Sequence, residues 1–189
     1  MFVWILISSL VASSANHICA PTLPIELEKK GVAASYVGIA FAFYNVGAIV
    51  WAPIVGKHLI TRMGAANLLS ISVGFLGVTF VVFGFIEVVG GSTSAITLAL
   101  LCRFMQGIAG STHWTTALAC ITTIAKPEET EKWLGINTAV WGIGFLGGPL
   151  LGSILYGIMG FKKQYWVYGG IVIVLSVFIR IGLARVPSQ

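Results

Sequence analysis

Residues 133–161, WLGINTAVWGIGFLGGPLLGSILYGIMGF, contain no Asp, Glu, Lys or Arg. A helix needs roughly 20 apolar residues to cross the hydrocarbon core of a bilayer, so this stretch by itself predicts a membrane-spanning helix. Residues 88–125 form a similar stretch with a single charge, Arg103. Further uncharged stretches are 1–25, 31–56, 63–86 and 164–179. The sequence therefore predicts an all-α membrane protein that crosses the bilayer several times.

The composition supports this class and excludes others. The 189-residue chain is 57% hydrophobic and 9% charged, whereas a soluble globular domain carries about 25% charged residues. A soluble enzyme, a nucleic-acid-binding module and a disordered protein are thereby excluded. We interpret the net charge of +5 as contact with anionic headgroups and as the bias of cytoplasmic loops. Cys19, Cys102 and Cys120 lie in apolar segments and are interpreted as small buried hydrophobic residues.

The uncharged stretches predict six transmembrane helices in a single domain that covers residues 1–189. An even number of crossings places both termini on one side of the membrane. Six Lys and Arg side chains, including Arg185, lie on the side of the termini and four on the other, which favours cytoplasmic termini. The predicted helices span roughly 2–24, 33–56, 66–88, 95–120, 133–158 and 164–184.

The two halves of the chain share a faint repeat. Residues 52–56 (APIVG) and 148–152 (GPLLG) both read small-Pro-apolar-apolar-Gly and lie 96 positions apart. The same offset aligns the pair Asn16-His17 with Thr112-His113. Transporters are often built from such repeats. Three helices make an odd number of crossings, so the repeat predicts two three-helix units that are inverted relative to one another, a 3+3 inverted repeat.

Polar side chains form a stripe on each of the first and fourth predicted helices. Because polar groups are costly in lipid, we expect both stripes to face protein or a wet cavity. The alternatives are hydrogen bonding between packed helices for the serines and a structural brace for the arginine. Tyr44 and Trp141 are candidates to line the same cavity, or else to pack the core. The stripes consist of Ser9, Ser13, Asn16 and the adjacent His17, and of Arg103, Gln106, Gly110 and His113.

Three motifs carry a resemblance to a known family. The loop after the second helix contains Gly56, Arg62 and Gly64, which match the loop motif of the major facilitator superfamily. Thr61 and the Ala-Ala pair at 65–66 replace the acidic residue and the basic pair of that motif. The charge latch that the family makes in this loop is therefore expected to be weakened.

The other two motifs lie on the fourth and fifth helices. Arg103 followed by Gln106-Gly107 is similar to the family's fourth-helix signature. The family's antiporter signature, Gly-x8-Gly-x3-Gly-Pro-x2-Gly, is matched by Gly135, Gly144, Gly148, Pro149 and Gly152. The chain thus resembles the N-terminal six-helix half of the family over nearly its whole length.

Pro21-x-x-Pro24 at the end of the first helix resembles the drug/proton antiporter and vesicular amine transporter branch. That branch has an Asp nine positions before the first Pro, where this chain has Ala12, and the chain contains no Asp at all. The resemblance implies a secondary active transporter of a small solute in the lipid bilayer. Proton-coupled antiport is one form of this function, with His17 and His113 as the titratable carriers.

The family works as a unit of about twelve helices, so the chain resembles one half of it. The other half is expected to be a C-terminal half, a second copy or other membrane subunits. A lone half is expected to expose Arg103, Gln106 and His113 on its uncovered side. The alternative function is that of a degenerate half-transporter, a structural or assembly subunit of a larger membrane complex. We expect no enzyme activity, no cofactor, no metal and no nucleic acid partner, because no catalytic or ligand-binding cluster is present. The sequence does not specify whether the plasma membrane or an organelle holds the protein.

Overall fold

The computed structural model describes residues 1–184, and Arg185, which entered the charge count, lies outside the described residues. Within this range every regular element is a helix, which confirms the predicted all-α class. The elements are α1 (Phe2–Ile18), α2 (Thr22–Lys29), α3 (Ala34–Ile54), a π-helical turn (Val55–Leu59), α4 (Ile60–Met63), α5 (Ala65–Phe83), a 3₁₀ turn (Gly84–Glu87), α6 (Ser92–Ile124), a second 3₁₀ turn (Pro127–Glu129) and α7 (Thr130–Gly182).

Five segments of the described chain are long and apolar enough to cross a membrane, where the sequence predicts six. The difference lies in α7, which is 53 residues long and covers the last two predicted helices, 133–158 and 164–184. Gly160 interrupts it with φ 76° and ψ 177°. Glycine adopts a positive φ without the steric penalty of a Cβ atom. The sequence predicts a short loop between the helices 133–158 and 164–184, whereas the structure has a break at the single residue Gly160.

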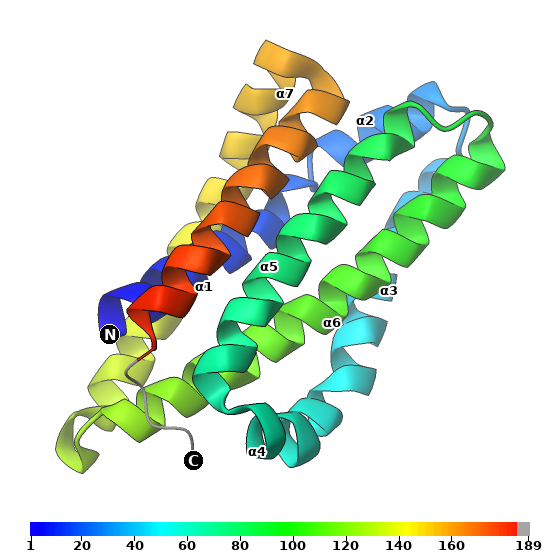
Figure 1. Ribbon diagram of the computed structural model, residues 1–189. Coiled ribbons are helices and arrows are strands. Elements are labelled where there is room, and N and C mark those ends of the chain that lie inside the picture. The colour runs from blue at the N-terminus through cyan, green and yellow to red at the C-terminus, as the bar shows by residue number, and fades with distance from the viewer. Residues whose placement is uncertain (185–189) are drawn as a thin grey trace.

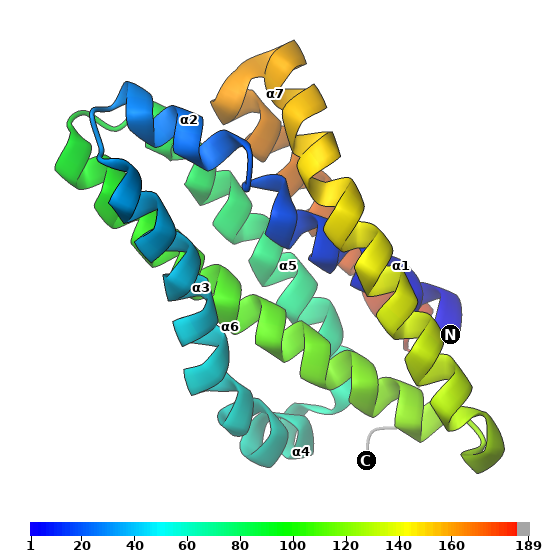
Figure 2. The same ribbon diagram turned by 180° about the vertical axis from the view of Figure 1, so that it is seen from behind.

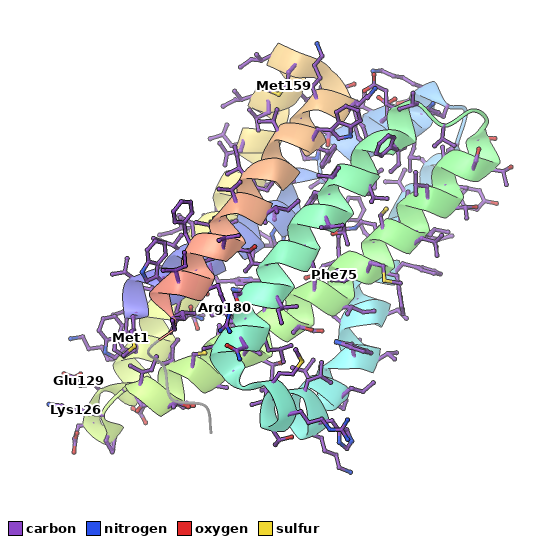
Figure 3. The ribbon with its side chains drawn as sticks, viewed as in Figure 1. Met1, Phe75, Lys126, Glu129, Met159 and Arg180 are labelled. Carbon is purple, nitrogen blue, oxygen red and sulfur yellow. The ribbon has the colours of Figure 1, made fainter. Side chains whose placement is uncertain are left out.

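The two legs of α7, 130–159 and 161–182, lie side by side and run in opposite directions (Figures 1 and 2). Figure 3 places Met159 at the end of the molecule opposite to Lys126 and Arg180. Met1 lies at the same end as Lys126 and Arg180. The chain thus enters and leaves the described bundle at one end.

The first predicted helix, 2–24, is shorter in the structure. α1 ends at Ile18, and a turn leads to the short helix α2. Pro21 has no backbone N–H and cannot donate to the carbonyl of His17, which favours an end of the helix at this point. Ala20 N donates to that carbonyl instead, over 3.0 Å.

The helices pack in pairs, and small residues set the closest approaches. α1 and α5 pack along α7, and α3 packs along α6 (Figures 1 and 2). A Cβ atom on Gly144 would lie 2.7 Å from the carbonyl oxygen of Leu10, and one on Gly148 would lie 2.7 Å from that of Ser14. Such close packing of small residues replaces the hydrophobic effect as a cause of association between helices in lipid.

Apolar side chains also cover much of the outer surface. Ile49 on α3 is 73% exposed, and Leu146 on the first leg of α7 is 76% exposed. A soluble protein rarely exposes large contiguous apolar patches. These helices therefore present surfaces suited to lipid or to another membrane-embedded segment.

Candidate substrate site

Arg103 is the one charged side chain in the middle of a long apolar helix, and the fold buries it. The residue is 3% exposed. Its Nη1 donates to Gln106 Oε1 over 2.9 Å, one turn along α6, and to Cys19 Sγ over 3.2 Å, at the end of α1. Its Nε is buried and has no hydrogen-bond partner among residues 1–184. The guanidinium is thus held in place with part of its donor capacity unused.

Two aromatic rings of α3 flank the guanidinium. Its Cζ lies 5.0 Å from the centroid of Phe41 and 4.9 Å from that of Tyr44. Rings at this distance attract a cation through their quadrupole. The spacing of the two rings, i and i+3, places them on one face of α3. α3 therefore supplies an aromatic wall for a charge carried by α6.

Among residues 1–184, no acidic side chain forms an ion pair with Arg103. The only ion pair among residues 1–184 joins Lys29 Nζ to Glu26 Oε2, 3.4 Å apart on α2. An unpaired charge in an apolar interior is costly, and a guanidinium does not lose its proton. None of the six acidic residues lies on α6, the helix that carries Arg103: they are Glu26, Glu28, Glu87, Glu128, Glu129 and Glu131.

A cavity of about 250 Å³ lies beside the guanidinium, between α1, α3 and α6. Asn16 Oδ1 at its wall is buried and has no hydrogen-bond partner in the described chain. His17 Nδ1 lies 2.8 Å from the carbonyl oxygen of Ser13. Because a carbonyl only accepts, Nδ1 carries a hydrogen, which leaves Nε2 of the neutral ring as its acceptor. The lining residues are Asn16, His17, Ala20, Phe41, Tyr44, Asn45 and Arg103.

The other sequence candidates lie in the interior and are not among the residues that line this cavity. His113 is fully buried, and its Nε2 lies 3.1 Å from Ser8 Oγ. Its ring stacks on that of Trp141 at 5.8 Å between centroids. The carbonyl of Trp141 accepts a hydrogen bond from Ser13 Oγ over 2.6 Å. Gln106 is fully buried beside Arg103. The structure thus brings Asn16, His17, Tyr44 and Arg103 to the cavity, and it places Gln106, His113 and Trp141 in helix packing.

The expectation that a lone half exposes its polar side chains is wrong. Arg103 is 3% exposed, and Gln106 and His113 are 0% exposed. Contacts with α1, α3 and the first leg of α7 cover them within this chain. Large apolar side chains, such as Ile49 and Leu146, are exposed instead.

In the loop motif, Gly56 and Arg62 are exposed to the surroundings, and Gly64 adopts a backbone conformation that favours glycine. Gly64 has φ 75° and ψ 144°, a region that favours glycine, and separates α4 from α5. Gly56 and Arg62 are exposed, and Arg62 makes no ion pair within residues 1–184. The latch that the motif forms in the family has no counterpart among these residues.

The antiporter motif of α7 divides into two parts. Gly144, Gly148 and Gly152 are spaced by four residues, and each packs against the backbone of α1. Gly135 is exposed, and nothing lies within 4 Å of its Cβ position. Pro149 lies within the helix that carries this stripe.

Sequence reasoning missed three contributors to the site. Cys19 was interpreted as a hydrophobic filler, although its sulfur accepts from Arg103. Phe41 and Asn45 line the cavity with Tyr44. Their spacing of i, i+3 and i+4 is a signal of one helical face that would have grouped them.

Comparisons with known proteins define the class. The sequence matches the profile of the Major Facilitator Superfamily over residues 5–189, and the chain belongs to this family. It is 27% identical over 171 residues to the MFS-type transporter SLC18B1 of Rattus norvegicus, covering 90% of the chain and 36% of that relative. It is 25% identical over 177 residues to the human protein of that name, covering 92% of the chain and 38% of the relative.

A bacterial protein has a similar percentage of residues identical to the chain. The chain is 27% identical over 133 residues to the tetracycline resistance protein, class B, of Escherichia coli, covering 70% of the chain and 31% of that protein. The chain spans about a third of the length of these relatives. The family prediction is confirmed, in line with the drug and amine transporter branch. The chain is a multi-pass integral membrane protein of a family of transporters.

Proposed function

We propose that the chain forms one six-helix half of a secondary active transporter for a small solute, arranged as a 3+3 inverted repeat. The observation that carries this proposal is the cavity between α1, α3 and α6, with the buried guanidinium of Arg103 at its wall. Intramembrane charges that face a cavity are typical of substrate and ion pathways. A purely structural half has no need of a buried charge beside a cavity.

The six crossings are supported by the break at Gly160. If each leg of α7 crosses the membrane once, Met159 lies on one side and both Lys126 and Arg180 lie on the other. Single cysteines at these positions, labelled in sealed vesicles by a membrane-impermeant maleimide, test this. Labelling of 126 and 180 from one side and 159 from the other is expected. Labelling of 126 and 180 from opposite sides contradicts six crossings.

The second half of the unit is proposed to cover the apolar faces of α3 and of the first leg of α7. Both faces carry large exposed side chains, such as Ile49 and Leu146. The aligned 171 and 177 residues make up 36% and 38% of these relatives, so each relative is more than twice as long as this chain and has room for a second helical half. A C-terminal half, a second copy or another membrane subunit are the occupants to be distinguished, by cross-linking from a cysteine at Ile49.

Proton coupling is proposed to use His17 rather than His113. His17 lies at the cavity wall with Arg103 and Tyr44, and Phe145 of α7 packs on its ring at 4.1 Å. His113 is sealed in the interior by Ser8 and Trp141. His17→Gln is therefore expected to flatten the pH dependence of transport, and His113→Gln is expected to leave its shape unchanged. The reverse result contradicts the assignment.

Transport itself is tested in proteoliposomes that contain the chain with its native partner. Uptake of a panel of small anionic, neutral and cationic solutes is measured for the wild type, Arg103→Leu and Arg180→Leu. Arg180 is exposed at the far end of α7, where it bonds to Asn67, and serves as the matched control. Loss of uptake only in Arg103→Leu is expected.

A structural or assembly subunit predicts a different result. The wild type then transports no member of the panel, and Arg103→Leu assembles as well as the wild type or better, because it removes a buried charge. The loop motif without its charge latch, with Arg62 exposed and unpaired among the described residues, is the feature that favours this second function.

A further inference from the structure

The donors at the cavity wall match one chemical class of ligand. Arg103 is 3% exposed and lines the cavity, and its buried Nε has no hydrogen-bond partner among residues 1–184. Asn16 on α1 and Asn45 on α3 line the same cavity. A planar guanidinium binds a carboxylate through two parallel hydrogen bonds, and amides supply further donors.

The acceptors that Arg103 already has do not neutralise it. Gln106 Oε1 is an uncharged amide oxygen, and Cys19 Sγ is a weak acceptor. No acidic side chain lies near the middle of α6. A negative charge that completes the site must therefore come from outside residues 1–184.

The same geometry disfavours an organic cation. The aromatic faces of Phe41 and Tyr44, which attract cations, already lie against the guanidinium of Arg103. A second positive charge in the cavity would lie beside the first in an apolar interior, where repulsion is weakly screened. Among the described residues that line the cavity none is acidic, so the lining offers a cation no carboxylate to pair with.

The volume limits the size of the ligand. About 250 Å³ corresponds to roughly eight water molecules at the liquid volume of ~30 Å³ each. A carboxylate with three or four carbon atoms fits this space. The amide oxygen Asn16 Oδ1, which lacks a donor, can accept from a hydroxyl group on such a molecule.

We propose that this cavity is a binding site for a small carboxylate, of the size of a hydroxy acid, with Arg103 as the residue that binds the carboxylate group. The proposal rests on the proposed transport function and gives its substrate class. The shared chemistry, a carboxylate on Arg103, is also available from a side chain of a covering segment, and the experiment separates the two sources.

Three probes of similar size and different charge test the site on the purified chain in lipid nanodiscs. Lactate is negative, lactamide is neutral and 1-amino-2-propanol is positive at pH 7. Binding is measured by saturation-transfer NMR and competition. Lactate is expected to bind at least about tenfold more tightly than lactamide, the least that a charge-assisted bidentate pair adds. The amine is expected not to compete.

Variants connect the preference to Arg103. Arg103→Met is expected to remove the difference between lactate and lactamide, Arg103→Lys to retain part of it, and the control Arg180→Met to retain all of it. Equal binding of lactate and lactamide by the wild type, or no lactate binding, overturns the proposal without any variant having to fold. An unchanged preference in Arg103→Met overturns it as well.

Further outcomes distinguish a failure of this proposal from a failure of the proposed transport function. Transport of 1-amino-2-propanol without lactate binding keeps the transporter and refutes the carboxylate site. Lactate binding without transport of any solute keeps the site and refutes the transporter. If the isolated chain binds lactate but the native assembly does not, a carboxylate of a covering protein segment occupies Arg103. That result overturns the proposal that the ligand is a solute.

Discussion

The side of α1 that faces α7 and the side that faces α3 are built differently. Toward α7, Ser9 Oγ donates to Asn137 Oδ1 over 2.7 Å, and Gly144 and Gly148 bring the two backbones together. Toward α3, Asn16 and His17 border a cavity of about 250 Å³. One helix thus serves as a fixed partner on one side and as a wall of the site on the other.

Polar residues of one predicted stripe therefore have different structural roles. Ser9, Ser13 and Asn16 belong to one predicted stripe, yet both serines bond to the first leg of α7. Asn16 Oδ1 has no partner in the described chain. Hydrogen bonding between helices and cavity lining are therefore the work of different members of the stripe.

The largest effect is expected where α1 and α7 are closest. A Cβ atom on Gly148 would lie 2.7 Å from Ser14 O and 2.9 Å from His17 Cβ, whereas nothing lies within 4 Å of that on Gly147. Gly148→Leu is expected to destabilise the fold by about 3 kcal/mol, by overpacking. Gly147→Leu is expected to stay within about 0.5 kcal/mol. Thermal unfolding in detergent measures both, and similar values for the two variants would refute the close-packed side.

An intermediate effect is expected from the hydrogen bonds of the same side. Ser9→Ala removes a buried bond to Asn137. Such bonds between membrane helices contribute about 0.6 to 1.7 kcal/mol, so the free energy of unfolding is expected to fall by that amount. The matched variant Asn16→Ala is expected to change stability by less than about 0.5 kcal/mol.

Asn16→Ala should act on the ligand instead. It is expected to weaken lactate binding about fivefold, the loss of one neutral hydrogen bond. If Asn16→Ala destabilises the fold as much as Ser9→Ala does, the proposed difference between the two sides of α1 is refuted. Unfolding and NMR titration of the same samples measure both quantities.

The smallest effect is expected between α3 and α6. Trp51 Nε1 donates to Thr112 Oγ1 over 3.1 Å. Trp51→Phe is expected to cost about 0.6 kcal/mol, the mean for a hydrogen bond between membrane helices. A double-mutant cycle with Thr112→Ala isolates the pair. A coupling energy larger than the loss of stability in Ser9→Ala would show that the bond between α3 and α6 is at least as strong as the bond between α1 and α7.

Much of the fold follows from local pattern, and the departures have local causes. The apolar stretches predict each helical region, because a chain in lipid must satisfy its own backbone hydrogen bonds. The boundary predictions differ at Pro21, which lacks a donor, and at Gly160, where one positive φ reverses the chain. A proline and a glycine have several permitted roles in a membrane helix, so their presence alone did not locate the end of α1 or the length of the turn in α7.

The candidate site was predictable in part. The polarity of Asn16, His17 and Arg103 in an apolar sequence marks them as exceptional, because lipid excludes such groups. The division between Arg103 at a cavity and His113 in a sealed interior was not predictable. Both lie on α6, and their surroundings come from α1, α3 and α7, which are distant in sequence.

The sequence by itself determined the all-helical membrane class and the family, because hydropathy and motif spacing are local properties of the chain. It also determined that Arg103 has no acidic partner in mid-helix, because all six acidic residues lie elsewhere. Only the tertiary structure decided that Phe41, Tyr44 and Cys19 surround the guanidinium. That arrangement depends on how closely separate helices approach each other, and the approach is set by packing between residues far apart in the sequence.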